Sequence, residues 1–337
     1  MNGMPTKVAV IGAGSWGTAV AAIACQNAPT VVWARRQELA DAIVTTHRSE
    51  AYLPGYELPD SLRATSSLED ACRGADVIVM GVPSHGFRDV LSEAVSHITP
   101  GTPIISLSKG LEQQSLLRMT EVINDVAPGC PAGVLTGPNL AKEVLAGYPA
   151  ASVVAIPDEA VRLELQQLFA TSAFRVYTNP DVVGCELAGA LKNVMAIAAG
   201  MADGMGFGDN TKAALITRGL AELTRLGCAL GGTPLTFSGL AGMGDLIATC
   251  ISPQSRNRHV GEQLGQGRRL AEIIDEMNMV AEGVKTSRVV VELSRREGIE
   301  MPIAEQVVAV LYDDKPAAEA IPALMLREAK PELHGIG

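Results

Sequence analysis

Two lysines and an aspartate stand where charged side chains could do proton chemistry. Lys192 lies in a helical stretch whose neighbours at helical spacing are small and apolar, so burial would lower the pKa of its ammonium group toward a useful range. Lys109 follows a predicted strand, and Asp245 ends the glycine-rich run 239–245. The plainer alternatives are a Lys192 that reaches solvent, a Lys109 solvated at a turn and an Asp245 that caps the next helix.

Two polar segments offer hydrogen-bond donors for an anionic substrate. Ser255, Arg256 and Asn257 combine a hydroxyl, a guanidinium and an amide, which are donors that a phosphate needs. Their alternative role is an exposed, polar start of a helix. Gly137 opens a close turn that contains Asn139, and this amide could either cap the following helix or donate to a substrate.

A glycine-rich turn follows the first predicted strand, 7–11. Gly12 allows a tight turn, Gly14 lets backbone N–H groups approach a pyrophosphate, and Gly17 lets the following helix lie close to the strand. The unpaired N–H groups and the dipole of that helix attract anions at its N-terminus. We therefore expect a dinucleotide at this turn.

The acidic residue that usually binds the adenosine ribose is missing after the second predicted strand. In its place stand Arg35 and Arg36, which could bind a 2′-phosphate through charge-assisted hydrogen bonds. The alternative is a pair of solvated arginines at the start of the next helix. The pair favours NADP as the cofactor, or tolerance of both NADP and NAD.

Composition narrows the class of protein. A chain of 337 residues with 47% hydrophobic residues, 4% aromatic residues and 34 glycines suits two domains with tightly packed α/β layers. The formal charge of −10 argues against nucleic-acid binding. Six cysteines without C-x-x-C pairs argue against a zinc site, and we expect no metal, no signal peptide, no membrane span and a cytoplasmic location.

Alternating strand and helix signals predict how these groups are positioned. Short apolar runs, among them 75–82 and 151–156, alternate with longer helical stretches as far as Asn179-Pro180, and helices separated by glycine-rich turns follow. The apolar stretch 187–205 predicts a buried helix rather than a membrane span, and the glycine-rich stretch 200–210 is expected to interrupt two helices. The expected fold is α/β, with an N-terminal Rossmann-like doubly wound sheet and a C-terminal all-helical domain. We predict a dinucleotide-binding domain at 1–180 and a helical substrate-binding and catalytic domain at 181–337.

Taken in order, these segments resemble the bacterial NAD(P)-dependent glycerol-3-phosphate dehydrogenases over almost the whole chain. The motifs that carry the resemblance are Gly12-Ala13-Gly14-Ser15-Trp16-Gly17-Thr18-Ala19, Ser108-Lys109-Gly110, Gly137-Pro138-Asn139-Leu140-Ala141-Lys142-Glu143, Glu186 to Val194, Gly239 to Asp245, Ser255-Arg256-Asn257 and Val280-Ala281-Glu282-Gly283. One departure is Asn139-Leu140, where many members have Ser-Phe, although the Asn139 amide can still donate a hydrogen bond to substrate.

The resemblance implies reversible reduction of dihydroxyacetone phosphate to sn-glycerol 3-phosphate, a phospholipid precursor, with Lys192 as proton donor and acceptor. It implies that substrate is bound by Lys109, Gly137, Asn139, Lys192, Asp245, Ser255, Arg256 and Asn257. It implies that cofactor is bound, beside the three glycines, by Ser15, Trp16, Arg35, Arg36, Lys109, Ala141, Arg256, Val280 and Glu282.

Two other functions stay open at this point. One is a related two-domain dehydrogenase acting on another hydroxy acid or sugar phosphate, and the other is a non-catalytic dinucleotide sensor. Retention of Lys109, Lys192 and Asp245 in their motifs argues against the sensor. The sequence leaves the oligomeric state open, a homodimer included.

Overall fold

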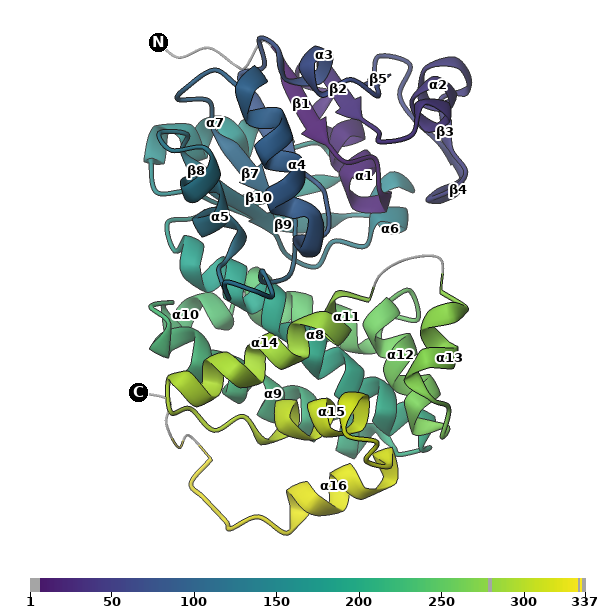
Figure 1. Ribbon diagram of the computed structural model, residues 1–337, viewed down its shortest axis with the longest axis vertical. Helices are drawn as coiled ribbons and strands as arrows, with labels where there is room; N and C mark the ends of the chain where they lie inside the picture. The colour runs from purple at the N-terminus through teal and green to yellow at the C-terminus, as the bar shows by residue number, and fades with distance from the viewer. Residues whose placement is uncertain (1–6, 278–280, 333, 335–337) are drawn as a thin grey trace. The chain divides into compact units, whose positions relative to one another are not determined.

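The computed structural model describes residues 7–277, 281–332 and 334 (Figure 1). The chain divides into two compact units. Residues 7–108 and 117–182 form the first, whereas 109–116 join the described residues after 182 to form the second. The predicted domain ranges 1–180 and 181–337 stay a prediction. They do not include the assignment of residues 109–116 to the second unit.

An eight-stranded, mostly parallel sheet organises the first unit. Its strand order is β10-β9-β8-β7-β6-β1-β2-β5, so the order reverses beside β1, as in doubly wound dinucleotide-binding folds. All pairs are parallel except β8 with β9. The strands are β1 (Val8–Ile11), β2 (Thr30–Trp33), β5 (Arg63–Thr65), β6 (Val77–Met80), β7 (Ile104–Ser106), β8 (Ala132–Thr136), β9 (Ala150–Ala155) and β10 (Phe174–Asn179). A separate two-stranded sheet pairs β3 (Arg48–Ser49) with β4 (Leu53–Glu57).

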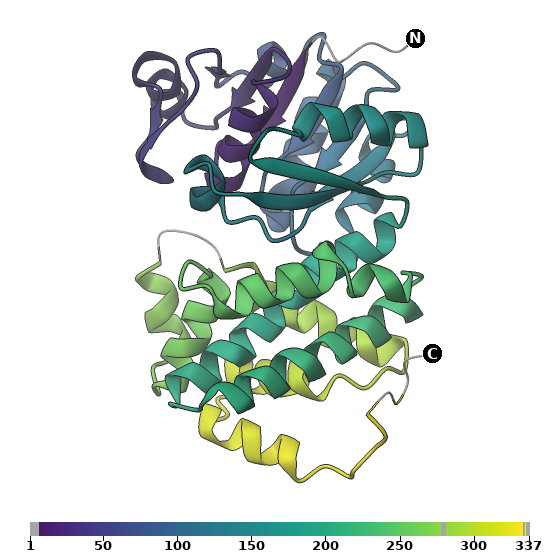
Figure 2. The same cartoon turned by 180° about the vertical axis from the view of Figure 1, so that it is seen from behind.

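Helices cover both faces of this sheet, because successive side chains of a strand point to opposite sides. Val8 and Val10 pack into one apolar core, whereas Ala9 and Ile11 pack into another. Figures 1 and 2, seen from opposite sides, show α4 over one face and α7 over the other. The helices of this unit are α1 (Ser15–Ala24), α2 (Gln37–Thr46), α3 (Leu68–Cys72), α4 (Phe87–Ala94), α5 (Met119–Val126), α6 (Ala141–Leu145) and α7 (Glu159–Phe169), and 3-10 turns lie at Ser84–Gly86 and Val95–His97.

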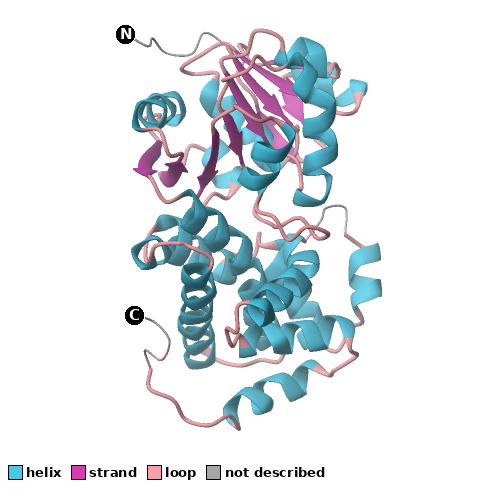
Figure 3. Cartoon of the chain, turned by 60° about the vertical axis from the view of Figure 1, so that its left-hand side comes forward, coloured by secondary structure: helices cyan, strands magenta, loops and turns pink. Residues whose placement is uncertain are grey.

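The second unit has helices and no strand among its described residues, and every strand in Figure 3 belongs to the first. Its helices are α8 (Val182–Gly204), α9 (Asp209–Ala229), α10 (Pro234–Phe237), α11 (Asp245–Ile251), α12 (Arg256–Gly265), α13 (Leu270–Asp275), α14 (Glu282–Arg296), α15 (Pro302–Tyr312) and α16 (Ala317–Met325), with a π-helical turn at Leu240–Gly244. Helix α8 is buried on all sides from Gly184 to Ala202. This confirms the prediction of a buried core helix here.

Glycines set the distance between α8 and α12. A Cβ atom added to Gly200 would lie 2.0 Å from the Arg258 carbonyl oxygen, and one added to Gly204 would lie 2.1 Å from that of Glu262. Gly261 of α12 faces the Ile197 carbonyl oxygen in the same way, at 2.0 Å. Two helices approach this closely only where side chains are absent, so these glycines fix where the N-terminus of α12 lies on α8.

The structure corrects one prediction for this region. The glycine-rich stretch 200–210 was expected to interrupt two helices, but α8 continues through Gly204 and the turn follows it. Gly200 and Gly204 serve helix packing, which makes their lack of a side chain useful inside a helix. Their spacing of four residues places both on one face.

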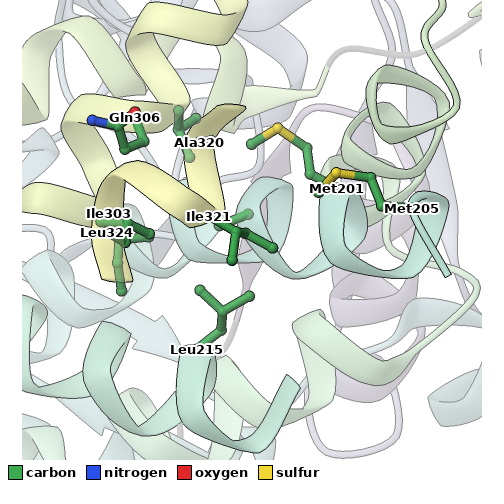
Figure 4. Close-up of a pocket in the computed structure, with 10 residues that line it drawn as sticks. Met201, Met205, Leu215, Ile303, Gln306, Ala320, Ile321 and Leu324 are labelled. Carbon is green, nitrogen blue, oxygen red and sulfur yellow. The ribbon is translucent and has the colours of Figure 1, made fainter. Parts of the chain in front are cut away.

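Apolar character alone does not locate a site in the second unit. Two stretches, Val182–Gly204 and Pro234–Ile251, are long and apolar enough to cross a membrane by composition, with 89% and 44% of their windows buried in the protein. A cavity of about 20 Å³ lies between Met201, Leu215 and Ile321 (Figure 4). It is mainly apolar and about the size that one water needs, so it is too small for a metabolite.

Candidate functional site

Lys192 and Lys109 bind the same carboxylate in the second unit. Lys192 Nζ lies 2.6 Å from Asp245 Oδ1, and Lys109 Nζ lies 2.6 Å from Asp245 Oδ2. Asp245 and Lys192 are 2% and 4% exposed. The alternatives of a Lys192 that reaches solvent and a Lys109 solvated at a turn are therefore wrong. The alternative that Asp245 caps the next helix is also wrong, because Gly244 is the N-cap of α11 and Asp245 is its first residue.

Burial tunes the chemistry of Lys192. Removal from water lowers the pKa of its ammonium group from 10.5 to about 8, and Asp245 opposes this shift by favouring the charged form. Lys109 adds to the lowering through like-charge repulsion. Thr249, one turn along α11 from Asp245, also contacts Lys192 Nζ and donates its hydroxyl to the Asp245 carbonyl oxygen at 2.6 Å. Lys192 is thus held by Asp245 and Thr249 with a pKa of about 8, a range in which an ammonium group can exchange protons near neutral pH.

The π-helical turn Leu240–Gly244 places Asp245 at the start of α11. A Cβ atom at Gly242 would lie 2.1 Å from the Phe237 carbonyl oxygen, so the turn folds back on α10 without room for a side chain. The Gly244 N–H donates to the Gly239 carbonyl oxygen at 3.1 Å and closes the wide turn. π-helical turns of this kind are frequent at functional sites. The glycine-rich run 239–245 therefore serves to direct Asp245 toward the two lysines.

A chain of amide hydrogen bonds ties the Lys109 segment to three helices. Asn193, next to Lys192 on α8, donates from Nδ2 to the Lys109 carbonyl oxygen at 2.8 Å. Asn257 donates from Nδ2 to Asn193 Oδ1 at 2.9 Å, and its own Oδ1 accepts the Gly283 N–H at 2.9 Å. Both amides are buried. Asn257 accordingly orders the protein at the site, and in the described part of the chain only one of its two amide N–H groups donates a hydrogen bond.

The N-terminus of α12 carries the predicted phosphate donors. Ser255 is its N-cap and accepts the Arg258 N–H at 3.2 Å, which leaves the hydroxyl proton able to donate elsewhere. Arg256 is exposed at the first helical position, and Glu282 acts on it electrostatically. A ten-residue helix whose N-terminus combines the Ser255 hydroxyl with the Arg256 guanidinium suits an anion.

The glycine turn of the first unit fits a dinucleotide pyrophosphate. Gly12 has φ +119°, and a Cβ there would lie 2.7 Å from the Gly81 carbonyl oxygen, while one at Gly17 would lie 2.0 Å from that of Gly12. Gly14, by contrast, faces open space within 4 Å and is the N-cap of α1 without a side-chain cap. The first N–H groups of α1 are therefore approachable by phosphate oxygens, as the motif predicts.

Four predicted cofactor residues surround this turn. Ser15 donates its hydroxyl to the Tyr52 carbonyl oxygen at 3.0 Å. Trp16 packs on Phe174, with ring centroids 6.2 Å apart, and its buried Nε1 has no partner among the described residues. Arg35 and Arg36 are exposed just after β2, and the Arg36 guanidinium lies 5.9 Å from the Tyr52 ring centre.

Gly137 and Asn139 form a second close turn in this unit. Gly137 has φ +140°, and a Cβ atom added to it would lie 3.2 Å from the Cα atom of Ser152 in β9. Asn139 donates from Nδ2 to Ser152 Oγ at 3.1 Å, and its buried Oδ1 lacks a partner in the described part of the chain. Leu140 is the N-cap of α6, so the alternative that Asn139 caps this helix is wrong. Ala141 begins α6.

Other positions complete the comparison with the sequence. Val280 lies outside the described residues, and Glu282 begins α14. Within the described ranges, no three His, Cys, Asp or Glu side chains gather as a metal site would require.

Thr249 and Asn193 were not singled out from sequence. Two sequence signals could have found them. Thr249 lies four residues after Asp245, on the same face of a helix, and Asn193 is a second polar residue beside Lys192 in an apolar helix.

The fold and these groups define a class: a dinucleotide-dependent dehydrogenase with a Rossmann-like unit and a helical unit that holds a buried lysine. Residues 7–162 match the N-terminus, and residues 181–322 the C-terminus, of NAD-dependent glycerol-3-phosphate dehydrogenase. The chain belongs to this family.

Relatives and solved structures agree over nearly the full length. A glycerol-3-phosphate dehydrogenase [NAD(P)+] 2 of Sphingopyxis alaskensis is 56% identical, covering 98% of this chain and 99% of its own. The glycerol-3-phosphate dehydrogenase [NAD(P)+] of Mycobacterium avium is 52% identical over 98% of this chain and 97% of its own. The crystal structure of glycerol-3-phosphate dehydrogenase from Coxiella burnetii has a TM-score of 0.92 at 36% identity, covering 96% of this chain and all of that one.

Proposed function

We propose that this protein interconverts dihydroxyacetone phosphate and sn-glycerol 3-phosphate with NAD(P)H and NAD(P)+. The observation that carries the proposal is the buried Lys192, which Asp245 and Thr249 hold with a pKa of about 8. When bound, the nicotinamide supplies or accepts the hydride at the substrate carbon. Family membership supports the substrate, and the two open alternatives have no comparable support.

Lys192 moves the proton in this scheme. Below pH 8 its ammonium group is mainly charged and can donate to the oxygen that becomes the alkoxide during reduction. In the reverse direction the neutral amine accepts the proton from the substrate hydroxyl. Asp245 keeps Lys192 and Lys109 in place, and the second ammonium stabilises negative charge on the same oxygen.

The N-terminus of α12 binds the phosphate end of the substrate in our proposal. Arg256 supplies a planar pair of donors, Ser255 its hydroxyl and Asn257 the free N–H of its amide. Gly137 and Asn139 are proposed as further substrate contacts, with the unpartnered Asn139 Oδ1 able to accept a substrate hydroxyl.

The dinucleotide is proposed to lie on the glycine turn of the first unit. Gly12, Gly14 and Gly17 shape the turn, while Ser15 and Trp16 begin α1. The other proposed cofactor residues are Arg35, Arg36, Lys109, Ala141, Arg256, Val280 and Glu282. Exposed Arg35 and Arg36 at the end of β2 support NADP, which carries a 2′-phosphate, as a cofactor beside NAD.

Steady-state kinetics test this function. Purified protein is assayed with dihydroxyacetone phosphate and either NADPH or NADH, following loss of the reduced nicotinamide absorbance and identifying the product. We expect turnover that requires the triose phosphate. Turnover of 6-phosphogluconate without any of the triose phosphate would assign the other dehydrogenase class, and dinucleotide binding without turnover would indicate a sensor.

We also propose a cytoplasmic enzyme that supplies glycerol 3-phosphate for phospholipid synthesis. A homodimer is the assembly we expect. Light scattering on the purified protein measures the oligomeric state directly. Fractionation of cells measures where the enzyme is located.

A further inference from the structure

Tyr52 connects two parts of the dinucleotide site in the first unit. It lies in the turn between β3 and β4, where its N–H donates to the Ser49 carbonyl oxygen at 3.0 Å. Leu53, the next residue, is fully buried and anchors the turn. Tyr52 itself is half-buried, so its ring stands at the surface on a fixed backbone.

The backbone and ring of Tyr52 contact different groups. Its carbonyl oxygen accepts the hydroxyl of Ser15, the first residue of α1, at 3.0 Å. Its ring lies 5.9 Å from the Arg36 guanidinium carbon, within range of a cation–π interaction. Ser15 marks the pyrophosphate end of the site, and Arg36 follows β2, where the adenosine ribose lies in this fold.

We propose that Tyr52 is a positioning residue that holds Arg36 ready for the 2′-phosphate of NADP(H), and so helps decide between NADP and NAD. This inference rests on the function proposed above. Arg36 is exposed, and its guanidinium makes no hydrogen bond or ion pair with the described residues, so without the ring this long side chain samples many rotamers. A guanidinium already ordered over Tyr52 loses less entropy when it binds a phosphate.

The proposal predicts different effects on NADP and NAD, which differ only in the 2′-phosphate. NAD lacks the 2′-phosphate, so ordering of Arg36 should strengthen binding of NADP while leaving NAD unaffected. The Ser15 contact uses the backbone of Tyr52 and survives replacement of the ring. Substitution of the side chain therefore tests the Arg36 contact alone.

The experiment is calorimetric titration of the full-length protein with 2′,5′-ADP and with 5′-ADP. We expect Tyr52→Leu to weaken 2′,5′-ADP about two- to fivefold, the range for an exposed cation–π contact, and to leave 5′-ADP unchanged. Tyr52→Phe should bind like the wild type because it keeps the ring. Arg36→Ala should lose about tenfold for 2′,5′-ADP, and Tyr52→Leu added to it should cost nothing more.

A matched control comes from the same unit. Arg175 lies 5.2 Å from the Tyr177 ring centre, so Tyr177→Leu removes a similar contact and should change neither affinity. Arg36→Lys keeps the charge without the planar group, so it should weaken 2′,5′-ADP even if Tyr52→Leu does not fold.

Three results would overturn the inference: equal weakening of both nucleotides by Tyr52→Leu, a further loss in the Arg36→Ala background, or unchanged 2′,5′-ADP affinity in Arg36→Lys. A wild type that binds both nucleotides equally also overturns it while leaving the dehydrogenase in place. A wild type that binds neither counts against the proposed function itself.

Discussion

Replacing Asp245 by Asn removes the charge that Lys109 and Lys192 share while keeping the shape of the side chain. Burial holds the pKa of Lys192 at about 8 although Asp245 favours its charged form. Loss of an opposite charge at this range lowers a pKa by about 1 to 3 units, so we expect about 5 to 7 in Asp245→Asn. Lys192 then loses its proton at or below neutral pH.

The expected rate follows from the protonated fraction. With a pKa of about 8, about nine-tenths of Lys192 is protonated at pH 7, whereas a pKa of about 5 to 7 leaves between about one-hundredth and one-half. Because reduction requires the protonated form, kcat at pH 7 should fall about 2- to 100-fold from this cause. The variant should recover part of its activity as the pH is lowered.

The assay is the pH dependence of kcat for dihydroxyacetone phosphate reduction. In the wild type the rate should decline as pH rises through about 8, and in Asp245→Asn the decline should move to lower pH. Asp203→Asn is the control, since Asp203 also binds two cations, Lys212 at 2.6 Å and Arg258 at 2.8 Å, but not Lys192. A variant whose rate declines at the same pH as the wild type would refute the reasoning.

Three further predictions address packing, pH and ligand coupling. Gly200→Ala places a Cβ 2.0 Å from the Arg258 carbonyl oxygen and should reduce the free energy of unfolding by about 1–3 kcal/mol in urea, whereas Gly208→Ala, with open space around it, should change little. Burial raises the pKa of Glu222 from 4.5 to about 7, so the native state keeps a proton that the unfolded chain has released; stability should fall by up to about 3 kcal/mol as pH rises through that window, and Glu222→Gln should lack this fall. Arg256→Ala should raise both the KM for dihydroxyacetone phosphate and the Kd for NADPH; a change in KM alone would exclude its proposed role with both ligands.

Strand and helix periodicity predicted the Rossmann-like sheet and the buried helix α8. The apolar run at 75–82 contains β6, and the run at 151–156 covers β9 except for Ala150, because buried strands are mainly apolar segments. The direction of β9 was not predictable, since apolar alternation is the same in parallel and antiparallel strands. The short strands β3 and β4 carry no periodic signal over two to five residues.

In the candidate site too, some features were predictable from the sequence and others were not. Lys192 was predictable as a buried lysine because its helical neighbours are small and apolar. Its pairing with Asp245, 53 residues away, depends on how α8 and α11 pack, and local sequence does not encode that distance. The same holds for Asn193 and Asn257, whose hydrogen bond spans 64 residues. Thr249 was recognisable only once Asp245 was known to begin a helix.

The central claim is that Lys192 transfers the proton, and Lys192→Ala tests it most directly. We predict that kcat/KM for dihydroxyacetone phosphate falls about 10²- to 10⁴-fold, the usual contribution of a general acid, while the Kd for NADPH, titrated in the absence of substrate, stays close to that of the wild type. Wild-type turnover in a folded Lys192→Ala protein would contradict the account.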